Sequence, residues 1–195
     1  MKRIALGIAL AAATLVGAVA PLKVGDKAPE FTAVDENGEQ HSLAQYQGRA
    51  VVLEWTNSEC PFVERHYESG AMKKLAAALG AKDVVWLAVN STYTNTPDDT
   101  KAWKKEQGFS YATIQDPDGN IGHMYGARTT PHMFVIDAHG ILRYRGAIDD
   151  DPQGRKPEPK NYVDSAVQAL LASATPNPAE TQSYGCSIKY KTASN

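Results

Sequence analysis

Residues 51–62 read VVLEWTNSECPF, and they place a cysteine between an apolar strand and a helix. The first residues of this stretch are β-branched and apolar, which predicts a buried strand. Pro61 suits the first turn of a helix, where its missing N–H costs nothing. An apolar stripe follows, so we expect a single helix that begins at Cys60 and ends near Leu79.

A thiol at the N-terminus of a helix is in a position that favours reactivity. It faces free backbone N–H groups and the positive end of the helix dipole, and both stabilise the thiolate. The position therefore predicts that Cys60 is a nucleophile whose pKa lies below the free value of about 8.5. The alternative is that Cys60 is only a small buried hydrophobic residue.

The rest of the chain alternates predicted strands and helices. Strands are expected at residues 31–34, 40–42, 50–55, 83–90, 112–115, 132–136 and 141–147. Helices are expected at residues 60–79, 97–107, 120–125 and 161–171. This pattern predicts an α/β fold with a central mixed sheet and helices on both faces. We expect one domain over residues 21–173, preceded by a signal peptide at 1–20 and followed by an irregular tail at 174–195.

Four further segments carry a resemblance to a known family. They are VGDKAPEF at 24–31, DENG at 35–38, TTP at 129–131 and GCSI at 185–188. Together with the Cys60 stretch they resemble the thioredoxin-like superfamily, and in particular peroxiredoxin-like (AhpC/TSA-type) redoxins with a single active-site cysteine. The resemblance implies a thioredoxin-like fold and thiol chemistry at Cys60. It also implies a cis peptide bond before Pro131, with the backbone of Thr130 facing the sulfur and forming part of the substrate-binding wall.

The chain also departs from the patterns of these families. Val63 stands where thioredoxins carry their second cysteine, which excludes an ordinary CxxC dithiol cycle. Leu53 and Asn57 replace the proline and threonine of the peroxiredoxin motif, and the usual active-site arginine is absent from its position. The resemblance therefore does not imply peroxidase activity by the usual set of side chains.

Three more residues are candidates for the site, each with an alternative. Glu54 corresponds to a buried acid of thioredoxins, which would shuttle protons with a raised pKa; otherwise it is a strand-end carboxylate in solvent. Asn57 would donate a hydrogen bond to a thiolate or peroxide oxygen, or would only hold the turn. Cys186 would resolve an oxidised Cys60, would form a structural disulfide, or would be an idle thiol.

Composition restricts the other possibilities. A net charge of −2 gives no case for a nucleic-acid partner. Two cysteines exclude a cysteine-rich metal site, and the five histidines are scattered, so we expect neither a metal nor another cofactor. Lys2 and Arg3 precede an Ala-rich apolar run, which predicts a cleaved secretory signal and a periplasmic location. The alternative is a retained anchor, but the run is short and weakly hydrophobic, so we expect no stable membrane span in the mature protein.

Two functions remain open at this point. The first is a secreted thiol-dependent oxidoreductase in which Cys60 attacks a peroxide or a protein disulfide. A reducing thiol protein or a small thiol would be its partner. The second is a redox-inactive thioredoxin-fold binding module that holds a partner peptide beside Pro131, with Cys60 buried and inert. Reaction of Cys60 with a thiol reagent in the folded protein would distinguish them.

Overall fold

The computed structural model describes residues 21–191, so the predicted signal peptide lies outside the described residues. The strands are β1 Thr32–Val34, β2 Gln40–Ser42, β3 Val51–Trp55, β4 Val85–Asn90, β5 Thr113–Gln115, β6 Thr129–Thr130, β7 His132–Ile136, β8 Leu142–Gly146 and β9 Cys186–Ser187. The helices are α1 Pro61–Glu68, α2 Ala71–Gly80, α3 Pro97–Gln107, α4 Asn120–Tyr125 and α5 Tyr162–Leu171, with a 3-10 turn η1 at Leu43–Tyr46.

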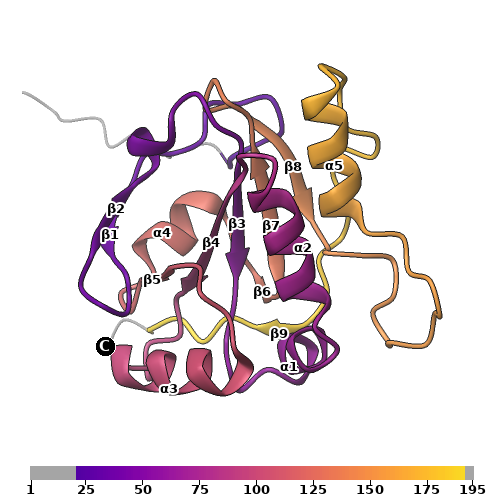
Figure 1. The fold of residues 1–195 in the computed structure, drawn as a ribbon. Helices are drawn as coiled ribbons and strands as arrows, with labels where there is room; N and C mark the ends of the chain where they lie inside the picture. Colours follow the sequence, from indigo (N-terminus) through magenta and orange to yellow (C-terminus); the bar gives the residue numbers. More distant parts are fainter. Residues whose placement is uncertain (1–20, 192–195) are drawn as a thin grey trace, which may run out of the picture.

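A five-stranded mixed sheet forms the centre of the molecule, with strand order β5-β4-β3-β7-β8. The central strand β3 is parallel to β4 and antiparallel to β7. In Figure 1, α2 and α5 lie in front of the sheet and α4 lies behind it. The predicted α/β fold, with a mixed sheet and helices on both faces, is confirmed.

Side chains along β3 alternate between the two faces of the sheet, as in any strand. Val51, Leu53 and Trp55 pack into the hydrophobic cluster that includes residues of α4. Val52 packs into the other cluster, which contains residues of α1, α2 and α5. The same alternation places Glu54 on the face that these three helices cover.

The prediction of a single helix from Cys60 to Leu79 is wrong, because the structure has two helices in this stretch. α1 ends at Glu68, and α2 begins at Ala71 after a left-handed residue at Gly70, with φ of +72°. Glycine adopts this conformation without the steric cost that a Cβ would bring, so it ends one helix and redirects the chain. The apolar stripe continued across the break and concealed it in the sequence.

The tail is also more ordered than predicted. Residues of the expected irregular tail form β9, which pairs antiparallel with β6 so that Cys186 lies opposite Thr130 and Ser187 opposite Thr129. In Figure 1 this C-terminal segment runs along the same end of the sheet as α1. The tail therefore packs on the end of the domain that carries the predicted active site.

Within residues 21–191, no helix combines the length and the apolar character needed to cross a bilayer.

Candidate active site around two cysteines

The junction between β3 and α1 holds Cys60. Cys60 is the N-cap of α1 with extended backbone angles, and Pro61 begins the helix, as predicted. The Cys60 N–H donates to the carbonyl of Asn57 at 3.1 Å, and the Cys60 carbonyl accepts from the N–H of Glu64 at 2.9 Å. These bonds fix the strand-to-helix turn on both sides of a cysteine that is 0% exposed.

The loop before β7 faces the sulfur. The Thr130–Pro131 peptide bond is cis, which confirms the expectation drawn from the resemblance. The Cys60 Sγ donates a hydrogen bond to the carbonyl oxygen of Thr130 at 2.9 Å. The Thr130 hydroxyl is buried and has no hydrogen-bond partner of normal length among the described residues. It is therefore available to donate to Cys60 once that sulfur loses its proton.

Cys186 brings the second thiol into this site. It lies opposite Thr130 in the β6–β9 pair, and it packs against the buried cluster that contains Cys60. Both cysteines are free thiols. Cys186 is half-buried, so it is the more exposed member of the pair. The structure thus brings together two cysteines that are far apart in the chain, without any swing of the tail.

The two thiols shift each other's pKa in opposite directions. Burial raises the pKa of Cys60, but hydrogen bonding with Cys186, with Thr130 and with the Val63 N–H outweighs it and leaves the pKa below the ordinary value. Burial and the neighbouring Cys60 raise the pKa of Cys186 to about 11. The direction agrees with the prediction, and both the Cys186 thiol and the Val63 N–H in the first turn of α1 contribute to it.

Glu54 lies beneath α1 and is 0% exposed, so the solvent-exposed alternative is wrong. Its carboxylate accepts hydrogen bonds from the Tyr67 hydroxyl and from the Trp86 Nε1, both at 2.9 Å. Burial raises the pKa of Glu54 to about 7, although these hydrogen bonds oppose the shift. The Tyr67 hydroxyl also lies 2.6 Å from that of Tyr111, which is half-buried. The hydrogen bonds of the described residues link Glu54 to these aromatic side chains and not directly to Cys60.

Asn57 is positioned as the turn-holding alternative describes. It is 2% exposed, and its Oδ1 accepts the N–H of Glu59 at 3.0 Å. An asparagine that bonds the backbone two residues later stabilises a turn of this kind. No hydrogen bond from the Asn57 amide to Cys60 is found among the described residues, and donation to a thiolate or peroxide oxygen stays a prediction.

Tyr184 anchors the C-terminal segment, and the sequence pattern did not single it out. Its hydroxyl lies 3.1 Å from the Nε2 of His66 on α1 and donates to the carboxylate of Asp149. Its ring packs against Phe62, with 6.1 Å between the ring centroids. The sequence did show an aromatic residue two positions before Cys186. It could not show the role of Tyr184, because the partners His66 and Asp149 are remote in the chain. This anchor holds β9 at the start of α1.

Removing the Thr130 hydroxyl should raise the pKa of Cys60. Thr130→Val keeps the side-chain shape, but it deletes a donor that stabilises the thiolate. Ultraviolet absorbance of the thiolate, followed through a pH titration, measures the change. Thr113→Val is the matched control because it deletes another buried hydroxyl without a partner, on β5. An unchanged Cys60 titration in Thr130→Val would show that this hydroxyl does not act on the sulfur.

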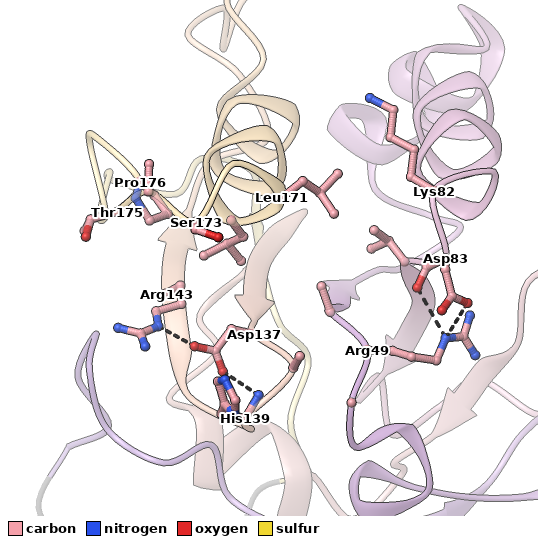
Figure 2. Close-up of a pocket in the computed structure, with 16 residues that line it drawn as sticks. Arg49, Lys82, Asp83, Asp137, His139, Arg143, Leu171, Ser173, Thr175 and Pro176 are labelled. Atoms are coloured by element: carbon pink, nitrogen blue, oxygen red, sulfur yellow. Dashed lines mark hydrogen bonds and ion pairs between the residues drawn. The ribbon is translucent and has the colours of Figure 1, made fainter.

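A pocket of about 490 Å³ lies at the opposite end of the sheet. Figure 2 shows it between the end of α5, the end of α2 and the turn that joins β7 to β8. Four of its charged side chains form ion pairs, Arg49 with Asp83 at 2.8 Å and Arg143 with Asp137 at 2.6 Å, while Lys82 donates to the neutral Gln168 side chain at 2.8 Å. Neither cysteine lines it, so the thiol site and this pocket are separate.

One group of possible metal ligands occurs in the described part of the chain. Single ligand atoms of Asp35, Glu39 and His41 lie within 4.8 Å of one another on the β1–β2 hairpin. Asp35 already accepts the backbone N–H groups of Asn37 and Glu39, as turn aspartates do. The group belongs to different elements from those that hold the two cysteines.

Among known proteins, the chain has relatives whose names describe thiol–disulfide chemistry. It is similar to the thiol-disulfide oxidoreductase ResA of Halalkalibacterium halodurans, with 30% identity over 121 residues that cover 62% of this chain and 66% of the relative. It is also similar to the thiol:disulfide interchange protein DsbE of Escherichia coli K12, with 28% identity over 134 residues, 67% of this chain and 68% of the relative.

Two solved structures share the fold over most of the chain, and a family model matches more than half of it. A hypothetical protein of Sinorhizobium meliloti 1021 superposes with a TM-score of 0.80 at 25% identity, covering 89% of this chain and 98% of that one. An uncharacterised conserved protein of Geobacillus kaustophilus gives a TM-score of 0.80 at 26% identity, covering 88% and 94%. Residues 24–145 match the model of the AhpC/TSA family. The chain with this paired-thiol site therefore belongs to the AhpC/TSA family of thioredoxin-fold proteins.

Proposed function

We propose that the protein is an exported thiol oxidoreductase in which Cys60 is the nucleophile and Cys186 is the resolving thiol. The observation that carries this proposal is the pair of free thiols beside Thr130, with the Cys60 pKa lowered and the Cys186 pKa raised to about 11. Because the thiolate is the attacking species, the lower pKa assigns the first attack to Cys60. Family membership supports thiol or disulfide substrates.

With a disulfide as oxidant, the Cys60 thiolate attacks one sulfur. A mixed disulfide forms and the other sulfur leaves as a thiolate. The Cys186 thiol then loses its proton and attacks the Cys60 sulfur, which releases the second substrate thiolate and forms the Cys60–Cys186 disulfide. The protein loses two electrons and the substrate gains them. Two equivalents of an external thiol reverse this oxidation and restore both cysteines.

With a hydroperoxide as oxidant, the Cys60 thiolate attacks the terminal oxygen. The O–O bond breaks, Cys60 becomes a sulfenic acid, and the alkoxide takes up a proton to leave as an alcohol. Cys186 then condenses with the sulfenic acid, which releases water and gives the same disulfide. Both oxidants therefore lead to one product within the protein, and the same thiol partner would reduce it.

Supporting groups have narrower roles in this proposal. Thr130 and Pro131 form the wall against which Cys60 reacts, and the Thr130 hydroxyl stabilises its thiolate. Glu54 holds a proton near neutral pH because burial raises its pKa to about 7. Its effect reaches the site through Tyr67 on α1 and not by contact with the sulfur. Asn57 holds the turn that presents Cys60.

The exported location rests on the sequence before residue 21. A basic start at Lys2 and Arg3 and an Ala-rich apolar run are typical of secretory signals. Disulfide chemistry of this kind persists outside the cytoplasm, where thiols are not kept reduced. The alternative function, a redox-inactive module that binds a peptide beside Pro131, has less support because β9 already pairs with Thr130.

Oxidation followed by peptide mapping tests the proposal. One equivalent of a small disulfide or of a hydroperoxide should convert both free thiols into a Cys60–Cys186 disulfide, which non-reducing peptide mapping detects. The reason is that Cys186 already lies beside Cys60. Protein in which Cys60 stays unmodified would support the inert binding module. Protein with Cys60 capped or over-oxidised and Cys186 free would show a single-cysteine enzyme.

A further inference from the structure

We propose that segment 184–188 sets the substrate class of the site, because it occupies the strand edge beside Cys60. With β9 in place, the site accepts small disulfides and hydroperoxides and excludes extended peptide disulfides. This inference rests on the proposed function, since it takes Cys60 as the reacting thiol. It adds that the chain itself fills the position that a peptide substrate would need.

β6 presents its backbone directly beside the reactive sulfur. The carbonyl of Thr130 accepts a hydrogen bond from Cys60, so any substrate sulfur that reaches Cys60 must lie next to this strand. Exposed strand edges carry unpaired N–H and C=O groups and pair readily with an extended chain. A peptide that delivers a disulfide to Cys60 would therefore pair with Thr129 and Thr130. β9 pairs with these same two residues.

Contacts on both sides fasten the segment in this position. Before β9, Tyr184 is anchored to α1 and to Asp149. After β9, the Ile188 N–H donates to the carbonyl of Arg128 at 3.1 Å. Lys189 forms an ion pair with Glu59 at 2.6 Å, next to the active-site cysteine in the chain. An incoming peptide must break these contacts before it can pair with β6.

The exposure of the two thiols bears on why small oxidants reach Cys60 more easily than extended peptides do. Cys60 is 0% exposed, and Cys186 beside it is half-buried. In this proposal, a small oxidant reaches the sulfur through a local opening beside the half-buried Cys186 side chain, with β9 still paired to β6. An extended peptide needs the whole of β9 to leave β6. The energetic cost of opening is therefore larger for a peptide than for a small molecule.

Gly185 offers a way to displace β9 without shortening the chain. Its φ is +132°, and a Cβ built on it would lie 2.0 Å from the carbonyl oxygen of Thr130. Gly185→Ala therefore forces the segment away from β6, since the obstacle is backbone and cannot rotate aside. The change is made in a Cys186→Ser background, so that the resolving thiol is absent from every protein compared.

The measurement is the rate at which Cys60 forms a mixed disulfide with two probes. One is a small aromatic disulfide and the other is an extended peptide that carries the same aromatic disulfide on a central cysteine. Relative to Cys186→Ser alone, the double variant should raise the peptide-to-small rate ratio by about tenfold or more. That factor corresponds to the loss of one or two hydrogen bonds of ordinary net strength.

Controls separate the possible outcomes. Gly140→Ala in the same background is the control for backbone strain, because Gly140 also has a positive φ but a Cβ there meets open space. It should leave the peptide-to-small rate ratio unchanged. Tyr184→Phe removes the anchoring hydroxyl and should raise the rate ratio, though less than Gly185→Ala does. Tyr184→Phe is the variant to use if Gly185→Ala does not fold. An unchanged ratio in folded variants of both kinds would overturn the inference. Failure of Cys60 to react with the small disulfide would instead contradict the proposed function.

Discussion

Cys60→Ser is expected to abolish thiol–disulfide turnover, whereas Cys186→Ser is expected to stop the cycle after its first step. A serine hydroxyl is not ionised near neutral pH and cannot replace the attacking thiolate. Without Cys186, the mixed disulfide or sulfenic acid at Cys60 has no partner within the protein. Steady-state reduction of a small disulfide, combined with intact-mass analysis of the oxidised protein, measures both effects.

Cys186→Ala adds a second readout that a merely structural role would not change, because alanine, unlike serine, has no side-chain hydrogen-bond donor. The thiol of Cys186 lowers the pKa of Cys60, so its loss should raise that pKa towards the ordinary value. Ser187→Ala is the matched control, because Ser187 is the exposed residue next to Cys186 on β9. It should leave the pKa of Cys60 unchanged. Full turnover by Cys186→Ser would show that the resolving thiol comes from another molecule.

Glu54→Gln is expected to change how folding stability depends on pH. The folded pKa of Glu54 is raised from its ordinary 4.5 to about 7, so between these values the unfolded chain binds fewer protons than the folded one. Stability therefore falls as pH rises through this window, and it is constant with respect to Glu54 above it. The shift corresponds to a loss on the order of 3 kcal/mol, which the neutral amide does not suffer.

Urea unfolding of both proteins, from about pH 4 to about pH 8, gives the difference in free energy of unfolding at each pH. The Glu54→Gln protein should gain stability relative to the parent as pH rises, and the gain should stop near pH 7. Other titrating groups, such as the buried His66, are common to both proteins and cancel in the difference. Glu106→Gln, at an exposed residue of α3, should give a flat difference. A flat difference for Glu54→Gln too would mean that the folded pKa of Glu54 lies at its ordinary value of 4.5.

Most elements could be predicted because their signals are local. The apolar run before Cys60 predicted β3, the threonine–proline start predicted α3, and the Asn37-Gly38 turn predicted the β1–β2 hairpin. Each of these signals acts over a few residues. The break at Gly70 was missed because a glycine within a continuous apolar stripe does not show whether the helix continues.

The sequence by itself determined that Cys60 stands at the junction of a buried strand and a helix, which Pro61 begins. It also determined that Cys60 has no second cysteine three residues later, because Val63 occupies that position. Only the tertiary structure decided the rest of the site. It placed Cys186 opposite Thr130, enclosed Glu54 between Tyr67 and Trp86, and added the neighbouring thiol to the groups that lower the Cys60 pKa. Local patterns encode strands, helices and turns through short-range sterics and periodicity. The contacts between remote segments depend on how the whole chain packs, and pKa values follow from those contacts.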